Sequence, residues 1–322
     1  MLETREQGLY CAAGGFFIDP VLPVDRAVIT HAHSDHARPG SAHYLTANAG
    51  LHLLRSRVGD DPRIQSVPYG EPVRIGDVVV SLHPAGHILG AAQVRMERGG
   101  EVWVAAGDYK LAADPTCTPF EPVRCHTFVT ESTFALPIFR WQEPRQTLTE
   151  IEVWWRENQA AGKASVLFVY PIGKAQRVLA ELDAAIGPIV CHPSVERINA
   201  IYRGQGIALP ATAEIEKRRR ALILAPPSAI GSQWLRQFTP ISAAMASGWM
   251  RIRGTRRRRA LDRGFVLSDH ADWPGLLHAI AQTGAESVWV THGYRAPLAR
   301  WLSDQGTPAQ AIELPVADAE AE

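Results

Sequence analysis

Short apolar runs that stop at polar residues recur along the first part of the chain. The runs GGFFIDP, RAVITHA, VVVSLHPAGH, GGEVWVAAGDYK and CHTFVTES have the length and the β-branched and aromatic content of strands. Polar or ligand-type side chains stand where these runs stop, at Asp19, His31, His87, Asp108 and Glu131. Catalytic groups carried on loops over a rigid sheet are arranged in this way.

The pattern changes in the middle of the chain. RQTLTEIEVWWRENQAAG has helical periodicity, and strand-like and helix-like runs alternate after it, in the order ASVLFVYP, AQRVLAELDAA, PIVC and PSVERINAIYRG. This alternation predicts a parallel α/β unit, which we place at residues 145–245. The end of the chain returns to the first pattern. We therefore expect an α/β fold in which the segments 1–144 and 246–322 form one domain around an inserted unit.

The composition limits the class of protein. The chain has 322 residues, of which 46% are hydrophobic, which is ample for a buried core. No apolar run reaches the roughly 18 residues that a membrane span needs, and the first residues lack the layout of a signal peptide. The four cysteines have no paired spacing, which argues against a disulfide framework or a cysteine zinc site. We expect a soluble, cytoplasmic protein without a membrane partner.

The charge of the chain is unevenly distributed. The formal net charge is zero, which argues against a chain that simply coats polyanions. Between Glu214 and Arg263, however, 12 Lys and Arg face 3 Asp and Glu, a net charge of +9 that leaves −9 for the remainder. This asymmetry favours a basic surface apposed to an acidic, metal-ready remainder. The alternative is that KRRR at 217–220 and TRRRRA at 255–260 are solvated loops.

The stretch THAHSDH contains the densest group of candidate ligands. His31, His33, Asp35 and His36 lie within six residues, in the spacing H-x-H-x-D-H. Zinc and similar ions take imidazole and carboxylate ligands, usually four or five for each ion. In an extended stretch, H-x-H sends two imidazoles to the same side, while Asp35 and His36 can face a second ion nearby.

Four ligands cannot complete two metal sites, and further candidates stand at later strand ends. These are His87 in PAGHILGA, Asp108 in AAGDYK and His292 in VTHGY. An aspartate can bridge two cations, and two ions about 3.5–4 Å apart make a hydrolytic centre. A lone histidine is more often a surface or core residue than a ligand, but chance rarely assembles this set, so the sequence favours a metal centre.

The motifs THAHSDH, GHILG, GDYK and THG resemble those of the metallo-β-lactamase superfamily, in the same order. The resemblance implies an αββα sandwich, which has two sheets with helices outside them. It also implies that His31, His33 and His87 hold one metal ion, that Asp35, His36 and His292 hold the other, and that Asp108 bridges them. Asp19 matches an aspartate that orients the ligand loop as structural support and does not bind metal.

Three further motifs resemble those of the β-CASP nucleases, the nucleic-acid-processing branch of that superfamily. Glu131 in VTESTF matches its acidic motif A, His270 in LSDHADW its motif B, and His292 its motif C. The inserted α/β unit lies between motifs A and B, as the compact β-CASP cap does. Within the branch, the chain most resembles bacterial ligase-associated DNA damage response exonucleases, also labelled mRNA 3′-end processing factors. These are encoded alongside ATP-dependent DNA ligases and helicases, which the resemblance implies as partners.

Three segments are candidates for substrate contacts. Gly173 and Lys174 open a helix after a strand, where backbone N–H groups and the lysine charge can hold an anion. Ser228 lies in a comparable loop, and Arg256 and Arg257 belong to an arginine-rich run that could contact a phosphate backbone without reading sequence. The alternative for Gly173 and Lys174 is an ordinary strand-to-helix turn.

These features predict a nuclease that hydrolyses phosphodiesters with two divalent metal ions, zinc first and manganese second. Asp108 fixes the metal pair, Asp35 orients the water, His270 acts on the scissile phosphate or its leaving group, and Glu131 supports a neighbouring residue. We expect a DNA-repair exonuclease that attacks single-stranded DNA from the 5′ end. The alternatives are an RNA-processing nuclease of the same fold, which the histidine at motif C favours, a thioester or lactone hydrolase, and a catalytically silent scaffold.

Overall fold

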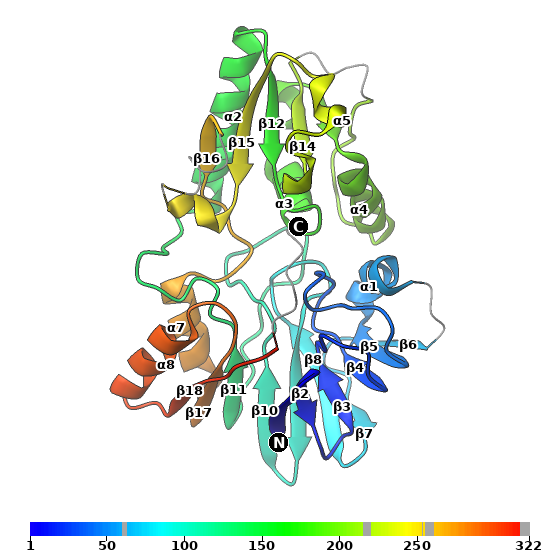
Figure 1. Cartoon of the computed structure of the whole chain (residues 1–322), viewed down its shortest axis with the longest axis vertical. Coiled ribbons are helices and arrows are strands. Elements are labelled where there is room, and N and C mark those ends of the chain that lie inside the picture. The colour runs from blue at the N-terminus through cyan, green and yellow to red at the C-terminus, as the bar shows by residue number, and fades with distance from the viewer. Residues whose placement is uncertain (60–62, 215–219, 253, 255–260, 316–322) are drawn as a thin grey trace. The chain divides into compact units, whose positions relative to one another are not determined.

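The computed structural model describes residues 1–59, 63–214, 220–252, 254 and 261–315 (Figure 1). The chain forms two compact units, and the predicted α/β class is confirmed. The first unit comprises residues Met1–Arg140 together with the described residues from His270 onward, and the second comprises Trp141–Asp269. No helix within these described ranges is both long and apolar enough to cross a membrane.

The first unit contains two mixed sheets. The first sheet has the order β1-β2-β3-β4-β5-β6. Its strands are β1 (Leu2–Arg5), β2 (Gly8–Cys11), β3 (Phe16–Ile18), β4 (Arg26–Val28), β5 (His43–Ala47) and β6 (Ile64–Val67). The second sheet has the order β18-β17-β11-β10-β9-β8-β7. Its strands are β7 (Val73–Ile75), β8 (Val78–Pro84), β9 (Ala92–Arg98), β10 (Glu101–Ala105), β11 (Thr127–Thr130), β17 (Ser287–Val290) and β18 (Ala309–Ala311).

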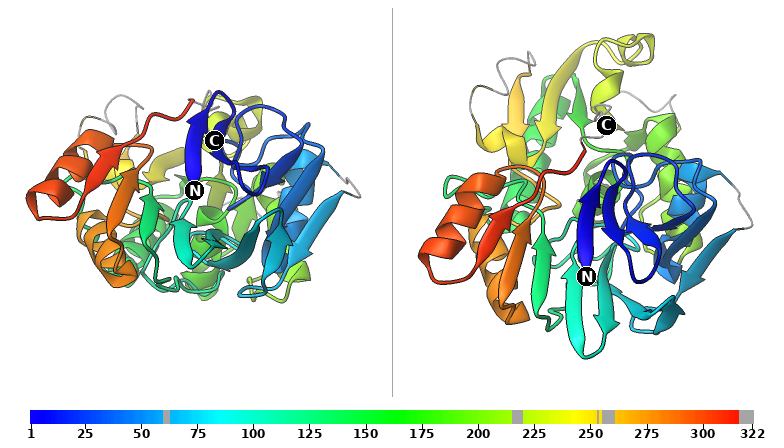
Figure 2. Two further views of the ribbon diagram at one scale, coloured as in Figure 1. Left: turned by 90° about the horizontal axis from the view of Figure 1, so that it is seen from below. Right: turned by 60° about the horizontal axis from the view of Figure 1, so that its bottom comes forward.

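A hydrophobic core lies between the two sheets. Phe16 and Val28 from the first sheet are buried with Val80 and Val94 from the second. Because side chains alternate along a strand, Ala27 faces away from this core and packs in a separate cluster beneath a helix. The unit's helical elements are η1 (Asn48–Gly50), α1 (Leu51–Val58), α7 (Trp273–Thr283) and α8 (Arg295–Asp304). The helix α1 contacts β5, α7 contacts β11, and α8 contacts β17 and β18 (Figures 1 and 2).

The second unit is built on an all-parallel sheet with the order β13-β14-β12-β15-β16. Its strands are β12 (Ala164–Phe168), β13 (Ile189–Cys191), β14 (Leu222–Ala225), β15 (Ile241–Ala246) and β16 (Arg263–Phe265). Its helical elements are α2 (Pro144–Ala160), η2 (Ala184–Ile186), α3 (Lys174–Glu181), α4 (Pro193–Gly204), η4 (Pro227–Ala229), α5 (Gln233–Arg236) and η5 (Gly248–Arg251). The strands lie between two separate hydrophobic clusters, which explains why they read as continuous apolar runs.

The boundaries of the second unit differ from the expected range 145–245. The helix α2 begins at Pro144, a residue whose fixed φ suits the first helical position. At the other end, β16 pairs in parallel with β15, so the unit continues to Asp269 and the first unit resumes at His270 instead of residue 246. The sequence pattern assigns the run RGFVLSDHADW, which contains β16, to the first domain, whereas the pairing of β16 with β15 places this strand in the second unit.

Candidate metal centre

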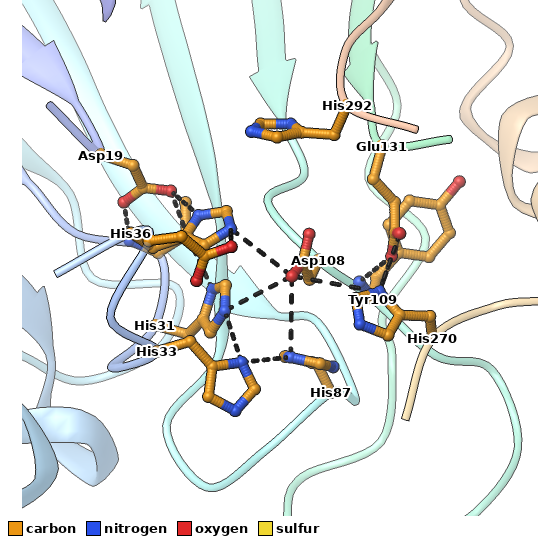
Figure 3. Close-up of polar contacts among 12 residues, drawn as sticks. Asp19, His31, His33, His36, His87, Asp108, Tyr109, Glu131, His270 and His292 are labelled. Atoms are coloured by element: carbon orange, nitrogen blue, oxygen red, sulfur yellow. Dashed lines mark hydrogen bonds and ion pairs between the residues drawn. The ribbon is translucent and has the colours of Figure 1, made fainter. Parts of the chain in front are cut away.

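The candidate residues follow the carboxyl ends of neighbouring parallel strands. In the second sheet β10, β11 and β17 run parallel, and Asp108, Glu131 and His292 follow their ends. In the first sheet β3 and β4 run parallel, and Asp19 and His31 follow theirs. Since the ends of parallel neighbours meet at one edge of a sheet, both sheets deliver polar side chains to one place (Figure 3).

Four potential ligand atoms converge around one point. The Nδ1 atom of His33 lies 3.1 Å from Nε2 of His31 and 3.1 Å from Nε2 of His87. Oδ2 of Asp108 lies 3.5 Å from Nε2 of His31 and 3.8 Å from Nε2 of His87. Four ligands placed tetrahedrally at zinc-like distances are separated by about 3.3–3.4 Å, so the four atoms fit a zinc-sized ion.

A hydrogen-bond chain sets the tautomer of His31. The Thr30 hydroxyl donates its only proton to Oδ2 of Asp19, at 2.5 Å. The hydroxyl oxygen of Thr30 also lies 3.0 Å from Nδ1 of His31, and because its own proton is already donated it must accept one from this nitrogen. Nε2 of His31 is then unprotonated and presents its lone pair to His33 and Asp108, as a metal ligand requires.

Asp19 is hydrogen-bonded to the loop that carries the candidate ligands. Its Oδ1 accepts the backbone N–H of Thr30 at 2.8 Å, and its Oδ2 lies 2.8 Å from Nδ1 of His36. Asp19, His31 and His36 are close enough to form a metal group of their own. Both oxygens of Asp19 already accept hydrogen bonds from this loop, which is the arrangement expected of an orienting residue. Its positive φ of 44° shows that the surrounding structure imposes this conformation.

The expected second ligand set is more open. Nε2 of His36 lies 3.5 Å from Oδ2 of Asp108 and 3.7 Å from Oδ2 of Asp35, while the ring centres of His36 and His292 are 5.5 Å apart. Asp35, His36, His292 and Asp108 do not form one of the tight ligand groups found among the described residues. The structure thus gathers these residues on one side of Asp108 but does not close them into a cage.

The electrostatics of the centre are dominated by buried, opposed charges. Burial lowers the pKa of His36, but the carboxylates of Asp108, Asp35 and Asp19 outweigh this and raise its pKa well above the ordinary value. Burial raises the pKa of Asp108, yet His36 and His270 hold it well below its ordinary range. Burial and the neighbouring His36 keep the pKa of His31 well below its ordinary value, so this ring is neutral and able to coordinate.

A third group joins Glu131 to His270. Glu131 is buried, and its Oε2 lies 2.8 Å from Nδ1 of His270 while its Oε1 accepts the backbone N–H of Tyr109 at 2.9 Å. Nδ1 of His270 lies 4.0 Å from Oδ2 of Asp108. The backbone N–H of Ala271 donates to the Tyr109 carbonyl at 2.7 Å. These bonds hold the His270 ring beside the candidate metal ligands, with Nδ1 directed at a carboxylate.

Two glycines in the motifs are required by close packing. At Gly107 a Cβ atom would lie 2.7 Å from Cβ of Thr30, and at Gly293 it would lie 2.3 Å from the carbonyl oxygen of Ser132. Both glycines also have positive φ, near 58° and 59°. Any side chain here would displace the segments that carry Asp108 and His292.

Sequence reasoning missed several supporting residues. Thr291 repeats the arrangement of Thr30, because its hydroxyl is 3.1 Å from the Thr130 carbonyl and 3.1 Å from Nδ1 of His292. The Ser132 hydroxyl donates to the carbonyl of His292. The detectable signal was the dipeptide Thr-His, which occurs at 30–31 and again at 291–292.

The residues expected to contact substrate belong to the second unit or lie outside the described residues. Lys174 is buried, and its Nζ pairs with Oδ2 of Asp269 at 2.8 Å. The structure therefore gives its charge an internal partner in place of an open anion site, while the N–H of Gly173 donates to the Gln176 side chain. Ser228 is exposed in η4, and Arg256 and Arg257 lie outside the described residues.

A cavity of about 300 Å³ opens beside the second ligand set. Its lining includes Asp35, His36 and His292 of the candidate centre, together with Arg295, Leu314 and Pro315. The centre is therefore reachable from a space large enough for a small group.

No family model matches the chain. It is 32% identical over 311 residues to a protein named "Probable DNA ligase" from Opitutus terrae, a match that covers 95% of this chain and 30% of the relative. It is 28% identical over 144 residues to "Endoribonuclease YSH1" of Saccharomyces cerevisiae, with 43% of this chain and 18% of the relative covered. The chain therefore spans less than a third of the length of these curated relatives. The chain is a relative of the β-CASP nucleases. The resemblance seen in the motifs is thus confirmed.

A solved structure resembles this β-CASP relative in fold. A protein of unknown function from Enterococcus faecalis V583 matches with a TM-score of 0.62 and 11% identity, over 90% of this chain and 80% of the other. At this low identity the match shows a shared fold alone. The chain thus shares sequence with the curated relatives and its fold with the Enterococcus faecalis protein.

Proposed function

We propose that the protein is a two-metal phosphodiester hydrolase that acts on nucleic acid. The observation that carries this proposal is the convergence of His31, His33, His87 and Asp108, with the tautomer of His31 fixed by Thr30 and Asp19. The names of the relatives, an endoribonuclease and a DNA ligase, support a nucleic-acid substrate.

The residues divide the work of hydrolysis between them. His31, His33, His87 and Asp108 would hold one ion, and Asp35, His36 and His292 would hold a second on the other side of Asp108. Two divalent ions, which we propose to be zinc with manganese as the alternative, would supply an activated water and neutralise charge on the phosphate. Asp35 orients the water that attacks phosphorus. His270 stabilises the phosphate or gives a proton to the leaving oxygen, and Glu131 holds its ring in place.

We further propose an exonuclease that trims single-stranded DNA from its 5′ end during repair in the cytoplasm. This chain aligns with about 30% of a relative named "Probable DNA ligase", which supports a link between trimming and sealing of DNA. RNA processing is the second candidate, because other relatives are named endoribonucleases and motif C carries a histidine, His292.

The test is a time course on end-labelled single-stranded DNA, duplex DNA and RNA, with zinc or manganese added to metal-free protein. We expect shortening of single-stranded DNA from the 5′ label, and no shortening by the Asp108→Asn variant. Faster cleavage of RNA, or first loss of the 3′ label, would replace the finer proposal and leave the two-metal hydrolase in place. No cleavage of any of the three substrates with either metal would reject the nuclease.

A further inference from the structure

The cavity beside the metal centre ends inside the protein. Its inner wall is formed by Leu9, Ile18 and Val129, which belong to the hydrophobic core between the two sheets. The opposite end reaches His36 and His292. A chain that enters from the metal centre meets this packed core and cannot continue through it.

The size of the cavity restricts its occupant. At about 300 Å³ it lies at the lower limit of the range for small-molecule sites. It therefore has room for about one nucleotide and none for a run of several. Its walls are apolar apart from the residues of the metal centre and one arginine.

Arg295 supplies the cationic group of this cavity. It is the first residue of α8, it is half-buried, and its Nη1 donates to the carbonyl of Ile312 at 2.9 Å. The N–H of Ile312 is itself bonded to the carbonyl of Val290, so the guanidinium is attached to an ordered wall. No carboxylate in the described part of the chain pairs with it, whereas Asp19 and Asp35 in the same lining both face His36.

We infer that this cavity binds the terminal nucleotide of a single strand, with Arg295 on its terminal phosphate and the apolar wall against its sugar and base. The inference rests on the proposed function and adds to it, because it makes the enzyme select chain ends. Guanidinium groups bind phosphate through paired, charge-assisted hydrogen bonds, which suits a group held at one fixed place. The residue is thus assigned to specificity and not to the chemical step.

The test compares Arg295→Gln with Arg300→Gln as a matched control. Arg300 lies on the same helix, is well exposed and faces Asp304 at 3.8 Å. The substrates are one single-stranded sequence with a 5′ phosphate, with a 3′ phosphate, with hydroxyls at both ends, and closed into a circle. We expect Arg295→Gln to raise KM roughly ten-fold for one phosphorylated end, with kcat and metal content changed far less. If KM rises for the 5′-phosphorylated strand the enzyme binds the 5′ end, and if it rises for the 3′-phosphorylated strand the enzyme binds the 3′ end.

A second variant tests the role of the cavity without changing a charged residue. Val21 is half-buried in its lining, and Val21→Trp should fill the space and raise KM for linear strands in the same way. Cleavage of the circle by the wild type as fast as of the linear strand would overturn the inference. An equal loss on all four substrates, or no loss in either variant, would overturn it as well. A wild type that hydrolyses none of them would contradict the proposed function instead.

Discussion

Thr30 and Thr291 each stand directly before a histidine that faces the candidate metal centre. In both cases the hydroxyl has an oxygen acceptor of its own, Asp19 for Thr30 and the Thr130 carbonyl for Thr291, and so it accepts a proton from Nδ1 of the next histidine. In both cases the proton therefore lies on Nδ1, and Nε2 of His31 and of His292 is left unprotonated with its lone pair available to a metal ion. A valine of the same shape would remove this control over the tautomer.

We predict that Thr30→Val weakens metal binding by roughly 10- to 100-fold, the usual cost of losing a group that orients a ligand. Thr30→Ser keeps the hydroxyl and should retain most of the affinity. The measurement is a titration of metal-free protein with zinc against a competing chelator, which does not depend on activity. Equal affinities for the valine and serine variants would show that the hydroxyl has no such role.

Glu131 offers one oxygen to the N–H of Tyr109 and the other to Nδ1 of His270. A glutamine has a single oxygen, so Glu131→Gln must direct its NH₂ group at one of these two donors. We predict a loss in kcat of roughly 10²-fold, the scale of a misplaced proton-transfer residue, with metal content retained. His270→Ala should cost about as much.

The double variant of Glu131 and His270 separates a shared role from two independent roles. If Glu131 acts through His270, the double variant should be no slower than His270→Ala alone. Additive losses in kcat would mean that Glu131 contributes to the reaction by another route.

At the scale of single residues, the sequence identified the candidate ligands better than their supports. The motif H-x-H-x-D-H indicates a metal site, because three histidines and an aspartate within six residues have few other uses. The role of Thr30 depends on Asp19, eleven residues earlier, and on which atom gives the proton. No periodicity or motif carries that information.

At the scale of elements, α3 holds the segment that precedes His270. Lys174 pairs with Asp269 at 2.8 Å, and Nη1 of Arg177 donates to the carbonyl of Ser268 at 3.1 Å. All of these residues are buried within the second unit. The pattern of helix and strand predicted α3, but the partner of Lys174 lies 95 residues away, and its pairing could not be inferred from a strand-to-helix turn.

We predict that Lys174→Met lowers the free energy of unfolding by about 3 kcal/mol, because it leaves the buried Asp269 with weaker compensation. The change in urea midpoint measures it. Arg156→Met is the control, since Arg156 and Asp183 form a half-exposed pair at 3.6 Å that should contribute less than about 1 kcal/mol. If Lys174 instead held substrate, its loss would weaken nucleic-acid binding and leave the midpoint unchanged.

At the scale of the whole molecule, the sequence predicts the order of the structural units and an uneven distribution of charge. The sequence anticipated an α/β fold with an inserted parallel unit, because apolar runs and helical periodicity are local properties. It did not locate the end of that unit, because β16 is defined only by its pairing with β15. The region between Glu214 and Arg263 carries a net charge of +9, and most of its Lys and Arg residues lie outside the described residues.

The last prediction concerns this basic region and the backbone of the substrate. Each phosphate neutralised by a bound protein releases counterions, so binding of single strands should weaken steeply with salt, by about 0.7 in the logarithmic slope for each contact. Reversing Arg256, Arg257, Arg258 and Arg259 to glutamate should lower this slope by roughly 2 to 3 if all four contact phosphates, and similarly for every sequence. The control reverses four exposed arginines elsewhere, at Arg98, Arg124, Arg197 and Arg300. Fluorescence anisotropy at several salt concentrations gives both slopes. If the two variants bind alike, the run is a solvated loop and the basic segment only adjusts the overall charge.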